Sequence, residues 1–282
     1  MEAEQGTVAA VSCNDTYAFT KPVRDEIVLI AGVGVKGDVH AGVHVKHRGR
    51  VRNDPTQPNF RQVHLIQQEL FAEVGAKGYA VAAGNLGENV TTSGIDLLAL
   101  PVGTILRFGP PEAASASAEA RRTAEMGRER PSAAVEVGPV AEAGAGAGPR
   151  ADAVAGAEAA AEAGSERPSA AGAVKAVLEV AAAAELDGAT AASAVAVAAA
   201  AARDRGDDGR PAVVLAGLRN PCGQINGFRP GLLKEVVGRG EGGDVVYKAG
   251  VMAVVLRGGS VRPGDAVTAE LPPLPHAPLE RV

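Results

Sequence analysis

The chain has 282 residues, only 3% aromatic residues, no tryptophan and a formal net charge of −5. This net charge creates no overall field that would attract nucleic acid or an anionic membrane, so any anion site must be local. The N-terminus lacks a secretory signal, and the most apolar run is shorter than the ~20 residues of a membrane span. Two distant cysteines, Cys13 and Cys222, form no disulfide framework. We therefore expect a cytoplasmic protein that binds neither nucleic acid nor a membrane.

Short apolar runs separated by glycine turns dominate residues 1–110 and resume at residue 211. Strands are predicted at residues 7–12, 27–31, 104–108, 212–218, 251–256 and 266–271. One segment changes period, because Val63, Ile66, Leu70 and Val74 fall at helical spacing, which predicts a helix that ends near Gly75. Many short strands and few helices indicate a mainly β, barrel-like domain.

Residues 111–210 differ in composition and are rich in Ala, Glu, Gly and Arg, so they are interpreted as an insertion between two parts of one domain, 1–110 and 211–282. The sequence of residues 129–134 recurs at 166–171, which indicates local duplication. We expect disorder in the first part of the insertion and helix within residues 173–203, where alanine is abundant. Because an alanine side chain buries little apolar area, we expect docking of such a helix on the domain to be only weakly stabilised. A long surface loop is the simpler interpretation, and a partner-binding arm is the alternative.

Cys222 is the first candidate for chemistry, in the sequence Arg-Asn-Pro-Cys-Gly-Gln directly after a predicted strand. The adjacent Pro and Gly indicate a rigid exposed turn. Arg219 favours the thiolate, which is the form that attacks sulfur and binds soft metals. The alternative is a buried, inert thiol. That alternative is the preferred interpretation for Cys13, which ends an apolar strand.

A glycine-containing basic loop at residues 36–52 is the second candidate. Its cationic and histidine side chains are Lys36, His40, His44, Lys46, His47, Arg48, Arg50 and Arg52. Arg61 and His64 add donors at the start of the predicted helix, where the helix N-terminus also favours anions. An anion site is the preferred interpretation. A zinc site built from His40, His44 and His47, or a plain solvated basic loop, are the alternatives.

The third candidate is the loop at residues 84–91. Glu88 and Asn89 could read an amide-like heterocycle such as a pterin, although turn chemistry explains Asn and Gly there equally well. The sequence has no P-loop, no convincing dinucleotide fingerprint and no Gly-x-Ser-x-Gly elbow.

In this order, the elements resemble the molybdenum cofactor sulfurase C-terminal (MOSC) domain family. The matching segments are residues 21–22, 34–42, 61–66, 84–90, 94–97, 218–222, 249–252 and 264–265. The resemblance covers nearly all of residues 7–110 and 211–271 and none of the insertion. It implies a mainly β, barrel-like MOSC fold with a few short helices, and a cysteine that carries sulfur as a persulfide or ligates molybdenum.

Carried onto this chain, the resemblance implies that Cys222 is the catalytic residue and the molybdenum ligand. The residues it implies for holding the phosphate and pterin of the molybdenum cofactor are Lys36, His40, Arg61, His64, Asn89, Arg219 and Asn220. Stand-alone members that look similar include hydroxylaminopurine reductases. The implied function is therefore an oxidoreductase that reduces N-hydroxylated substrates with electrons from a separate protein.

The alternative function implied by the resemblance is a non-catalytic carrier of sulfur or cofactor that uses a Cys222 persulfide. A degenerate scaffold whose insertion recruits partners ranks below both. The family's association with pyridoxal phosphate belongs to a desulfurase domain, for which 282 residues leave no room. A separate cysteine desulfurase would therefore supply the sulfur.

Overall fold

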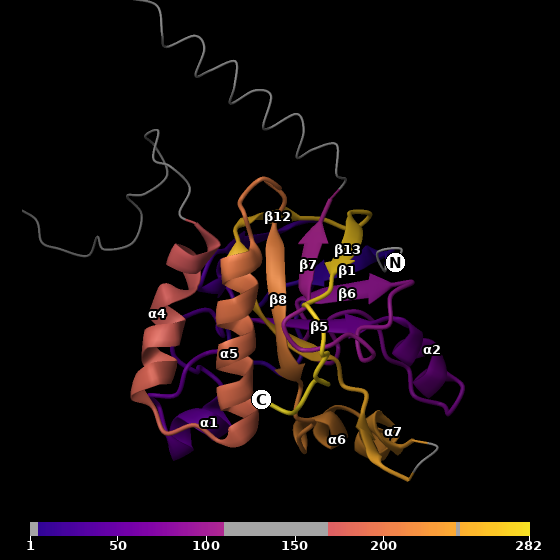
Figure 1. Cartoon of the computed structure of the whole chain (residues 1–282). Coiled ribbons are helices and arrows are strands. Elements are labelled where there is room, and N and C mark those ends of the chain that lie inside the picture. The colour runs from indigo at the N-terminus through magenta and orange to yellow at the C-terminus, as the bar shows by residue number, and fades with distance from the viewer. Residues whose placement is uncertain (1–4, 110–168, 241–242) are drawn as a thin grey trace, which may run out of the picture. The chain divides into compact units, whose positions relative to one another are not determined.

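The computed structural model of the chain describes residues 5–109, 169–240 and 243–282 (Figure 1). The strands are β1 (Gln5–Ser12), β2 (Val23–Arg24), β3 (Ile27–Ile30), β4 (Gly34–Val35), β5 (Val63–Gln67), β6 (Val90–Ser93), β7 (Ile105–Phe108), β8 (Ala212–Leu218), β9 (Val237–Arg239), β10 (Val245–Tyr247), β11 (Val251–Arg257), β12 (Gly259–Val261) and β13 (Ala266–Glu270). The helices are α1 (Arg48–Asn53), α2 (Glu69–Gly75), α4 (Ala170–Ala183), α5 (Gly188–Arg203), α6 (Gln224–Phe228) and α7 (Leu232–Val236). The predicted mainly β class is confirmed.

Seven of these strands close into a barrel in the order β13-β7-β8-β11-β5-β6-β1, because β13 also pairs with β1. Neighbouring barrel strands run antiparallel except β5 and β6, which are parallel. Closure removes the exposed sheet edges that an open sheet of this length would present. The short strand β2 pairs with β1 beside the barrel, and two smaller sheets, β12-β3-β4 and β9-β10, complete the described strands.

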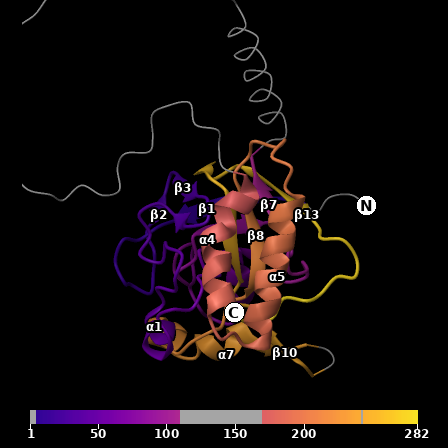
Figure 2. The same ribbon diagram turned by 60° about the vertical axis from the view of Figure 1, so that its left-hand side comes forward.

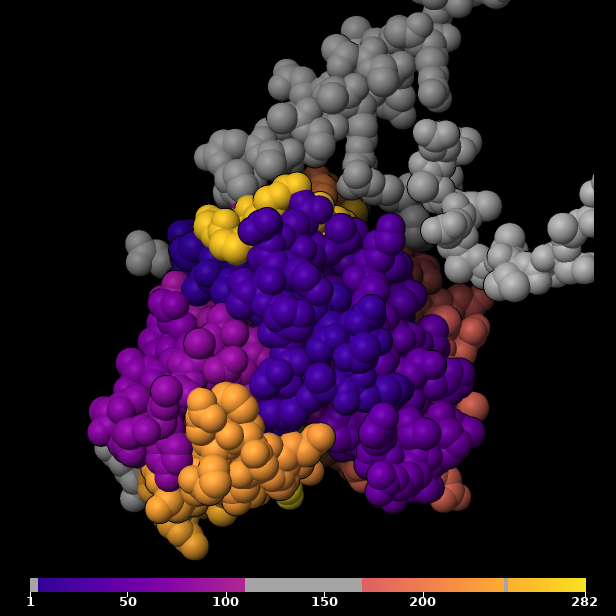
Figure 3. Space-filling view, turned by 180° about the vertical axis from the view of Figure 1, so that it is seen from behind, coloured from indigo at the N-terminus to yellow at the C-terminus, as the bar shows by residue number. Residues whose placement is uncertain are grey.

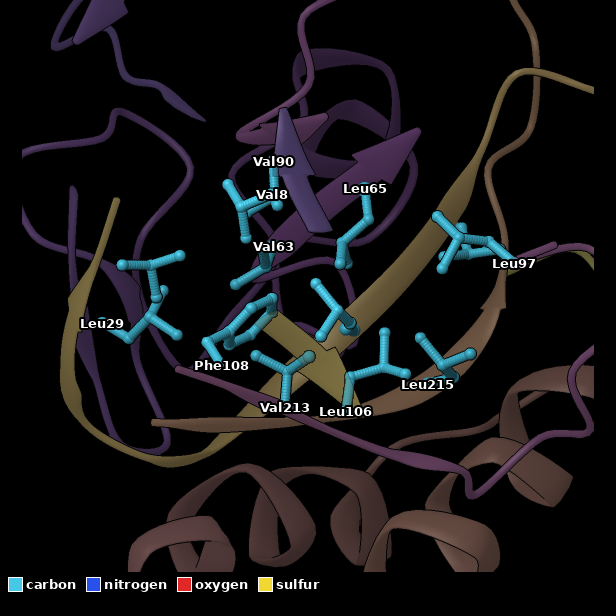
Figure 4. Close-up of a cluster of buried hydrophobic side chains, with 14 of the residues drawn as sticks. Val8, Leu29, Val63, Leu65, Val90, Leu97, Leu106, Phe108, Val213 and Leu215 are labelled. Carbon is cyan, nitrogen blue, oxygen red and sulfur yellow. The ribbon is translucent and has the colours of Figure 1, made fainter. Parts of the chain in front are cut away.

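The barrel interior is filled by aliphatic side chains from every part of the domain. Val8, Leu65, Leu106 and Val213 point toward one another inside the barrel (Figure 4), and each is at most 1% exposed. Branched aliphatic side chains suit closely paired strands, which explains how a chain with so few aromatic residues fills a core.

The helix predicted from Val63 to Val74 is wrong over its first half. Val63–Gln67 is the barrel strand β5, and the helix α2 begins only at Glu69. Val63 to Ile66 are all buried because barrel strands contact the interior on one face and covering elements on the other. A strand buried on both faces shows no alternation of apolar and polar residues. Its buried residues, followed directly by those of α2, fall by chance at the spacing of a helix.

The described part of the predicted insertion is helical, as expected, with α4 and α5 joined by a short connection. The strands that flank the insertion are direct neighbours, with Arg107 of β7 opposite Ala212 of β8. The first part of the insertion, including most of the duplicated segment, lies outside the described residues.

The expectation that such helices would not dock is wrong. In Figure 2, α4 and α5 stand together in front of β8, and α4 also contacts β11. Val174, Val177 and Val197 are fully buried in a cluster with barrel residues of β8 and β11. Valines interspersed among the alanines supply the apolar contact area that alanine alone lacks.

Polar contacts and close backbone approach fix this docking. The Ser193 hydroxyl donates to the Ala216 carbonyl oxygen at 2.6 Å, and the Arg203 guanidinium donates to the Gly103 carbonyl oxygen at 2.9 Å. Gly32 has a positive φ, and a Cβ there would overlap the Ala173 carbonyl oxygen.

Within the described ranges, no helix is long and apolar enough to cross a membrane.

Candidate functional site

A pocket opens where five loops and the strands β5 and β11 meet. The wall is formed by Tyr17, Ala18, Phe19, Lys21, His40, Val45, Lys46, His47, Arg48, Asn59, Arg61, His64, Leu86, Gly87, Asn89, Arg219, Gln224 and Met252. This wall contains five Lys or Arg side chains and no Asp or Glu. Seen from behind, a hollow lies between the orange segment that carries α6 and α7 and the indigo-to-purple N-terminal part (Figure 3). The pocket is thus a basic site in an acidic chain.

Arg219 is the buried cation of this pocket. It follows β8, where its backbone N–H donates to the Gly250 carbonyl oxygen at 2.9 Å. The side chain is 7% exposed, and its guanidinium lies 5.8 Å from the centre of the Phe19 ring. Its Nη1 atom has no hydrogen-bond partner among the described residues. A buried guanidinium with a free donor is costly, which makes the site complementary to an anion.

Arg61 adds a second positive charge just before β5. Burial lowers its pKa to about 9, and the positive charges of Arg50 and Arg219 act in the same direction. Its Nη1 atom donates to the Val282 carbonyl oxygen. At neutral pH this guanidinium is still charged, so two like charges share one pocket. An anion between them would relieve both the repulsion and the desolvation.

A buried polar network supports the pocket from behind. The Lys21 ammonium lies 2.6 Å from Asp38 Oδ2, and Asn89 Nδ2 donates to the same oxygen at 2.8 Å. Asp38 Oδ1 accepts from the His40 backbone N–H at 2.9 Å and lies 3.1 Å from His40 Nδ1. Burial alone would raise the pKa of Asp38, but the hydrogen bonds from His40 and the charge of Lys21 hold it well below its usual range. Asp38 is therefore a fixed carboxylate.

Asn89 and His64 line the pocket, but their polar atoms already have protein partners. Asn89 Oδ1 accepts from the His64 backbone N–H at 3.2 Å, and Asn89 Nδ2 also donates to the Ser12 carbonyl oxygen. His64 Nε2 lies 2.8 Å from the Ala249 carbonyl oxygen. Burial and the charge of Arg219 hold the pKa of His64 well below 6.5, so the ring is neutral. The Asn89 amide, which the sequence suggested for hydrogen bonds to a pterin, is thus already hydrogen-bonded to groups of the protein.

Glu88 stabilises the loop that carries it and does not line the pocket. Its carboxylate is fully buried and accepts from the backbone N–H groups of Gly84 at 2.5 Å and Leu86 at 3.1 Å. Burial raises the pKa of Glu88, with these hydrogen bonds acting in the opposite direction. This is the turn chemistry that the sequence left open as an alternative.

Cys222 lies beside the pocket but is not part of its wall. It is half-buried on the turn between β8 and α6, and its Sγ atom lies 3.4 Å from Oε1 of the wall residue Gln224. Burial lowers the pKa of Arg219, and an ionised Cys222 opposes that shift, so the thiol and the guanidinium lie close enough to interact. The same holds for Arg61. The expected exposed turn is thus present, and the thiol adjoins the basic pocket.

Besides Cys222, two residues expected to hold the cofactor lie outside the pocket wall. Lys36 is exposed, and its contact near the site is through its backbone oxygen, 3.7 Å from Cys13 Sγ. Asn220 is also exposed. Arg61 and His64 lie on strand β5 or just before it, so no helix N-terminus contributes there. Cys13 is half-buried and packs against the barrel core.

Several wall residues were missed from the sequence. Lys21 is the clearest, since a buried lysine looks like any other before its partner Asp38 is known. Tyr17 is another, and it stacks against Arg48 of the predicted basic loop, with the guanidinium 4.7 Å from the ring centre. The zinc alternative has no support in the part of the chain described, which holds no group of three or more His, Cys, Asp or Glu side chains placed to bind a metal.

Comparison with known proteins identifies the fold. Neither the models of known protein families nor the curated proteins give a match. Among solved structures, the YuaD protein of Bacillus subtilis is similar with a TM-score of 0.51 and 17% sequence identity, covering 96% of this chain and 99% of that one. The chain has the MOSC fold.

Other solved structures are less similar to this MOSC-fold chain. YiiM of Geobacillus stearothermophilus has a TM-score of 0.45 and 10% identity, with 97% of this chain and 79% of that chain covered. YiiM of Escherichia coli has a TM-score of 0.40 and 11% identity, with 98% and 73% covered. At these identities the likeness concerns the fold, and activity has to be argued from the site.

Proposed function

We propose that this MOSC-fold chain binds the molybdenum cofactor in the basic pocket and reduces N-hydroxylated substrates, with Cys222 as the molybdenum ligand. The observation that carries the proposal is the buried Arg219 with an unpartnered Nη1 atom, next to Arg61 and beside a half-buried thiol. A phosphate-bearing, soft-metal cofactor needs this donor set: guanidinium groups for the phosphate and a thiolate for the metal.

The residues present fit such a group. Arg219 and Arg61 would hold the phosphate, His40 would face the bound ligand, and the aliphatic wall at Leu86 and Met252 would exclude water. His64 and Asn89 would contribute shape rather than hydrogen bonds, because their polar atoms are engaged. Lys36 and Asn220 would need the loops that carry them to move before they could reach the ligand.

When bound, the cofactor would supply two-electron oxygen-removal chemistry that protein side chains lack. The chain would supply binding, orientation and electrostatics. Arg219 and Arg61 would neutralise the phosphate, and Cys222 would present its sulfur at the pocket edge. A separate protein would deliver the electrons, and a cytoplasmic location remains a prediction.

The alternative is a sulfur or cofactor carrier, and one observation favours it. Cys222 lies outside the pocket wall and is half-buried, so a persulfide there would be reachable by a partner protein. In that case a separate cysteine desulfurase would load the sulfur, and the chain would have no turnover of its own.

The test is to purify the chain from a host that makes the cofactor and to measure bound molybdenum, released pterin fluorescence and dithionite-driven reduction of hydroxylaminopurine. Stoichiometric molybdenum and turnover that disappears in Cys222→Ser support the reductase. Cyanide-labile sulfur that disappears in Cys222→Ser, without turnover, supports the carrier. Cys13→Ser is the matched control and should retain either property. A wild-type chain without molybdenum, pterin or labile sulfur contradicts both.

The phosphate subsite has its own test. Arg219→Gln should retain less than a tenth of the wild-type pterin content, because charge-assisted hydrogen bonds contribute about 1.5–3 kcal/mol each. Arg205→Gln, an arginine far from this pocket wall, is the control for charge loss. Equal pterin content in all three proteins would argue against the subsite.

A further inference from the structure

His40 is held in one orientation by a carboxylate. Asp38 Oδ1 lies 3.1 Å from His40 Nδ1 and also accepts the His40 backbone N–H at 2.9 Å. Because a carboxylate only accepts hydrogen bonds, Nδ1 carries the proton. The second ring nitrogen, Nε2, has no hydrogen-bond partner among the described residues, and the ring is part of the pocket wall.

Asp38 itself cannot move away. Its side chain is 1% exposed and is tied to Lys21 and Asn89 through its other oxygen. The carboxylate–imidazole arrangement fixes the tautomer and the orientation of the ring, as an orienting carboxylate does for catalytic histidines elsewhere.

The other histidines of the wall are unsuited to proton transfer at neutral pH. Nε2 of His64 faces the Ala249 carbonyl oxygen, and the ring is buried. Burial lowers the pKa of His47 to about 4, with the charges of Arg61, His40, Arg219 and Arg50 adding to this. His40 alone in this wall has a carboxylate partner.

The groups that face His40 come from three neighbouring segments. Tyr17 meets the ring edge-on, with centroids 6.0 Å apart, and the His47 ring centre lies 6.2 Å away. Lys46, Arg48 and Arg61 are the other cations of the wall near this loop, and Asp38 is the anion.

We propose that His40 is the general acid of the pocket, with Asp38 as its positioning residue. This inference rests on the reductase form of the proposed function. The bound cofactor would supply the two electrons that break the substrate nitrogen–oxygen bond, with dithionite as the external reductant in the assay. The nitrogen takes one proton from Nε2 of the doubly protonated His40 ring, which leaves a neutral ring with its proton on Nδ1. The oxygen leaves as water with a second proton from solvent, and solvent then returns a proton to Nε2. An N-hydroxylated base thus becomes an amine plus water.

The experiment compares four proteins purified with cofactor: wild type, His40→Asn, His40→Gln and His44→Asn. Asparagine keeps a donor near the Nδ1 position and removes the transferable proton. Glutamine places an amide near the Nε2 position. His44 is exposed on the same loop and lies outside the pocket wall, so its variant is the matched control.

We expect kcat for hydroxylaminopurine to fall about 100-fold in both His40 variants, the usual contribution of a general acid. KM, molybdenum and pterin content should stay within twofold of wild type, and His44→Asn should match wild type throughout.

A second readout does not depend on turnover. Nitrogen-15 NMR of the histidine rings should find the His40 proton on Nδ1 in wild type. A proton on Nε2 of the neutral ring, or unchanged kcat in His40→Asn, overturns the inference while leaving cofactor binding intact. Absence of molybdenum and turnover in wild type overturns the proposed function itself, and the general-acid role with it.

Discussion

The ammonium group of Lys21 and the carboxylate of Asp38 form a buried ion pair, 2.6 Å apart and almost without solvent contact. The pair joins the loop after β1 to the loop after β4, and it fixes the position of His40 at the pocket wall. Burial lowers the pKa of Lys21, and the charge of Asp38 opposes that shift.

Removing one partner of this pair should be costly. Lys21→Met leaves a buried carboxylate without its cation, and we expect a loss of about 3 kcal/mol in the free energy of unfolding. Urea denaturation followed by circular dichroism measures the change. The double variant with Asp38→Asn should recover part of the loss, and a single variant as stable as wild type would show that the pair contributes nothing.

His47 should make the fold sensitive to mild acid. Its pKa is lowered from 6.5 to about 4 in the folded chain, so the unfolded chain binds the proton first as the pH falls. The stability that His47 confers is therefore complete above pH 6.5 and lost between there and pH 4, by on the order of 2 kcal/mol.

The measurement is the free energy of unfolding of wild type and His47→Gln from pH 7.5 to 4. The wild-type curve should fall more steeply than the variant curve between pH 6.5 and 4, because the variant lacks the titrating ring. Parallel curves over the whole range would contradict the prediction.

Gly84 is expected to tolerate no side chain. It has a φ of +79°, and a Cβ there would overlap the Lys21 carbonyl oxygen. Gly78 has a φ of +89° but open space around a Cβ, so Gly78→Ala is a control for backbone strain alone. We expect Gly78→Ala to lose about 1 kcal/mol and Gly84→Ala at least twice as much, measured by thermal unfolding. Equal losses of stability in the two variants would mean that the loop carrying Lys21 moves aside for the new Cβ without a loss of free energy.

The docking of α5 can be tested with two valines on the same helix. Val197 is fully buried against the barrel, whereas Val195 is 70% exposed. Val197→Ala should destabilise the chain by about 2 kcal/mol, and Val195→Ala should change it by less than about 0.5 kcal/mol. Both substitutions remove the same two methyl groups from a helix, so their difference reports burial alone. Similar effects would indicate that α5 does not cover the barrel in solution.

The barrel strands were predictable because their signals are local. Runs such as residues 104–108 and 212–218 are apolar, short and bounded by turns, and β7 and β8 correspond to them. The β5–α2 segment was mistaken because a fully buried strand carries no period-two pattern. The docking of α4 and α5 depends on which valines meet β8 and β11, which is a property of two distant segments and not of either one.

For the site too, features with a local sequence signal could be predicted, and contacts between distant segments could not. His40 and Arg61 were singled out because basic charge gathers there in an acidic chain, and Arg219 because it precedes Cys222. All three lie in one pocket wall. Lys21 was missed because only tertiary structure shows that it is buried against Asp38. Asn89 lies in the pocket wall, and its part in holding a pterin stays a prediction. Its hydrogen-bond partners Ser12 and Asp38 could not be predicted, because they lie 77 and 51 residues away.

Closure of the barrel through β1 and β13 has a consequence during synthesis. Residues 5–7 of β1 pair with residues 266–268 of β13, which leave the ribosome last among the barrel strands. Until then, β1 offers an unpaired edge to any neighbouring chain, and the nascent protein is exposed to aggregation for most of its translation time. Expression yield should therefore depend on chaperone supply more than the stability of the finished barrel would suggest.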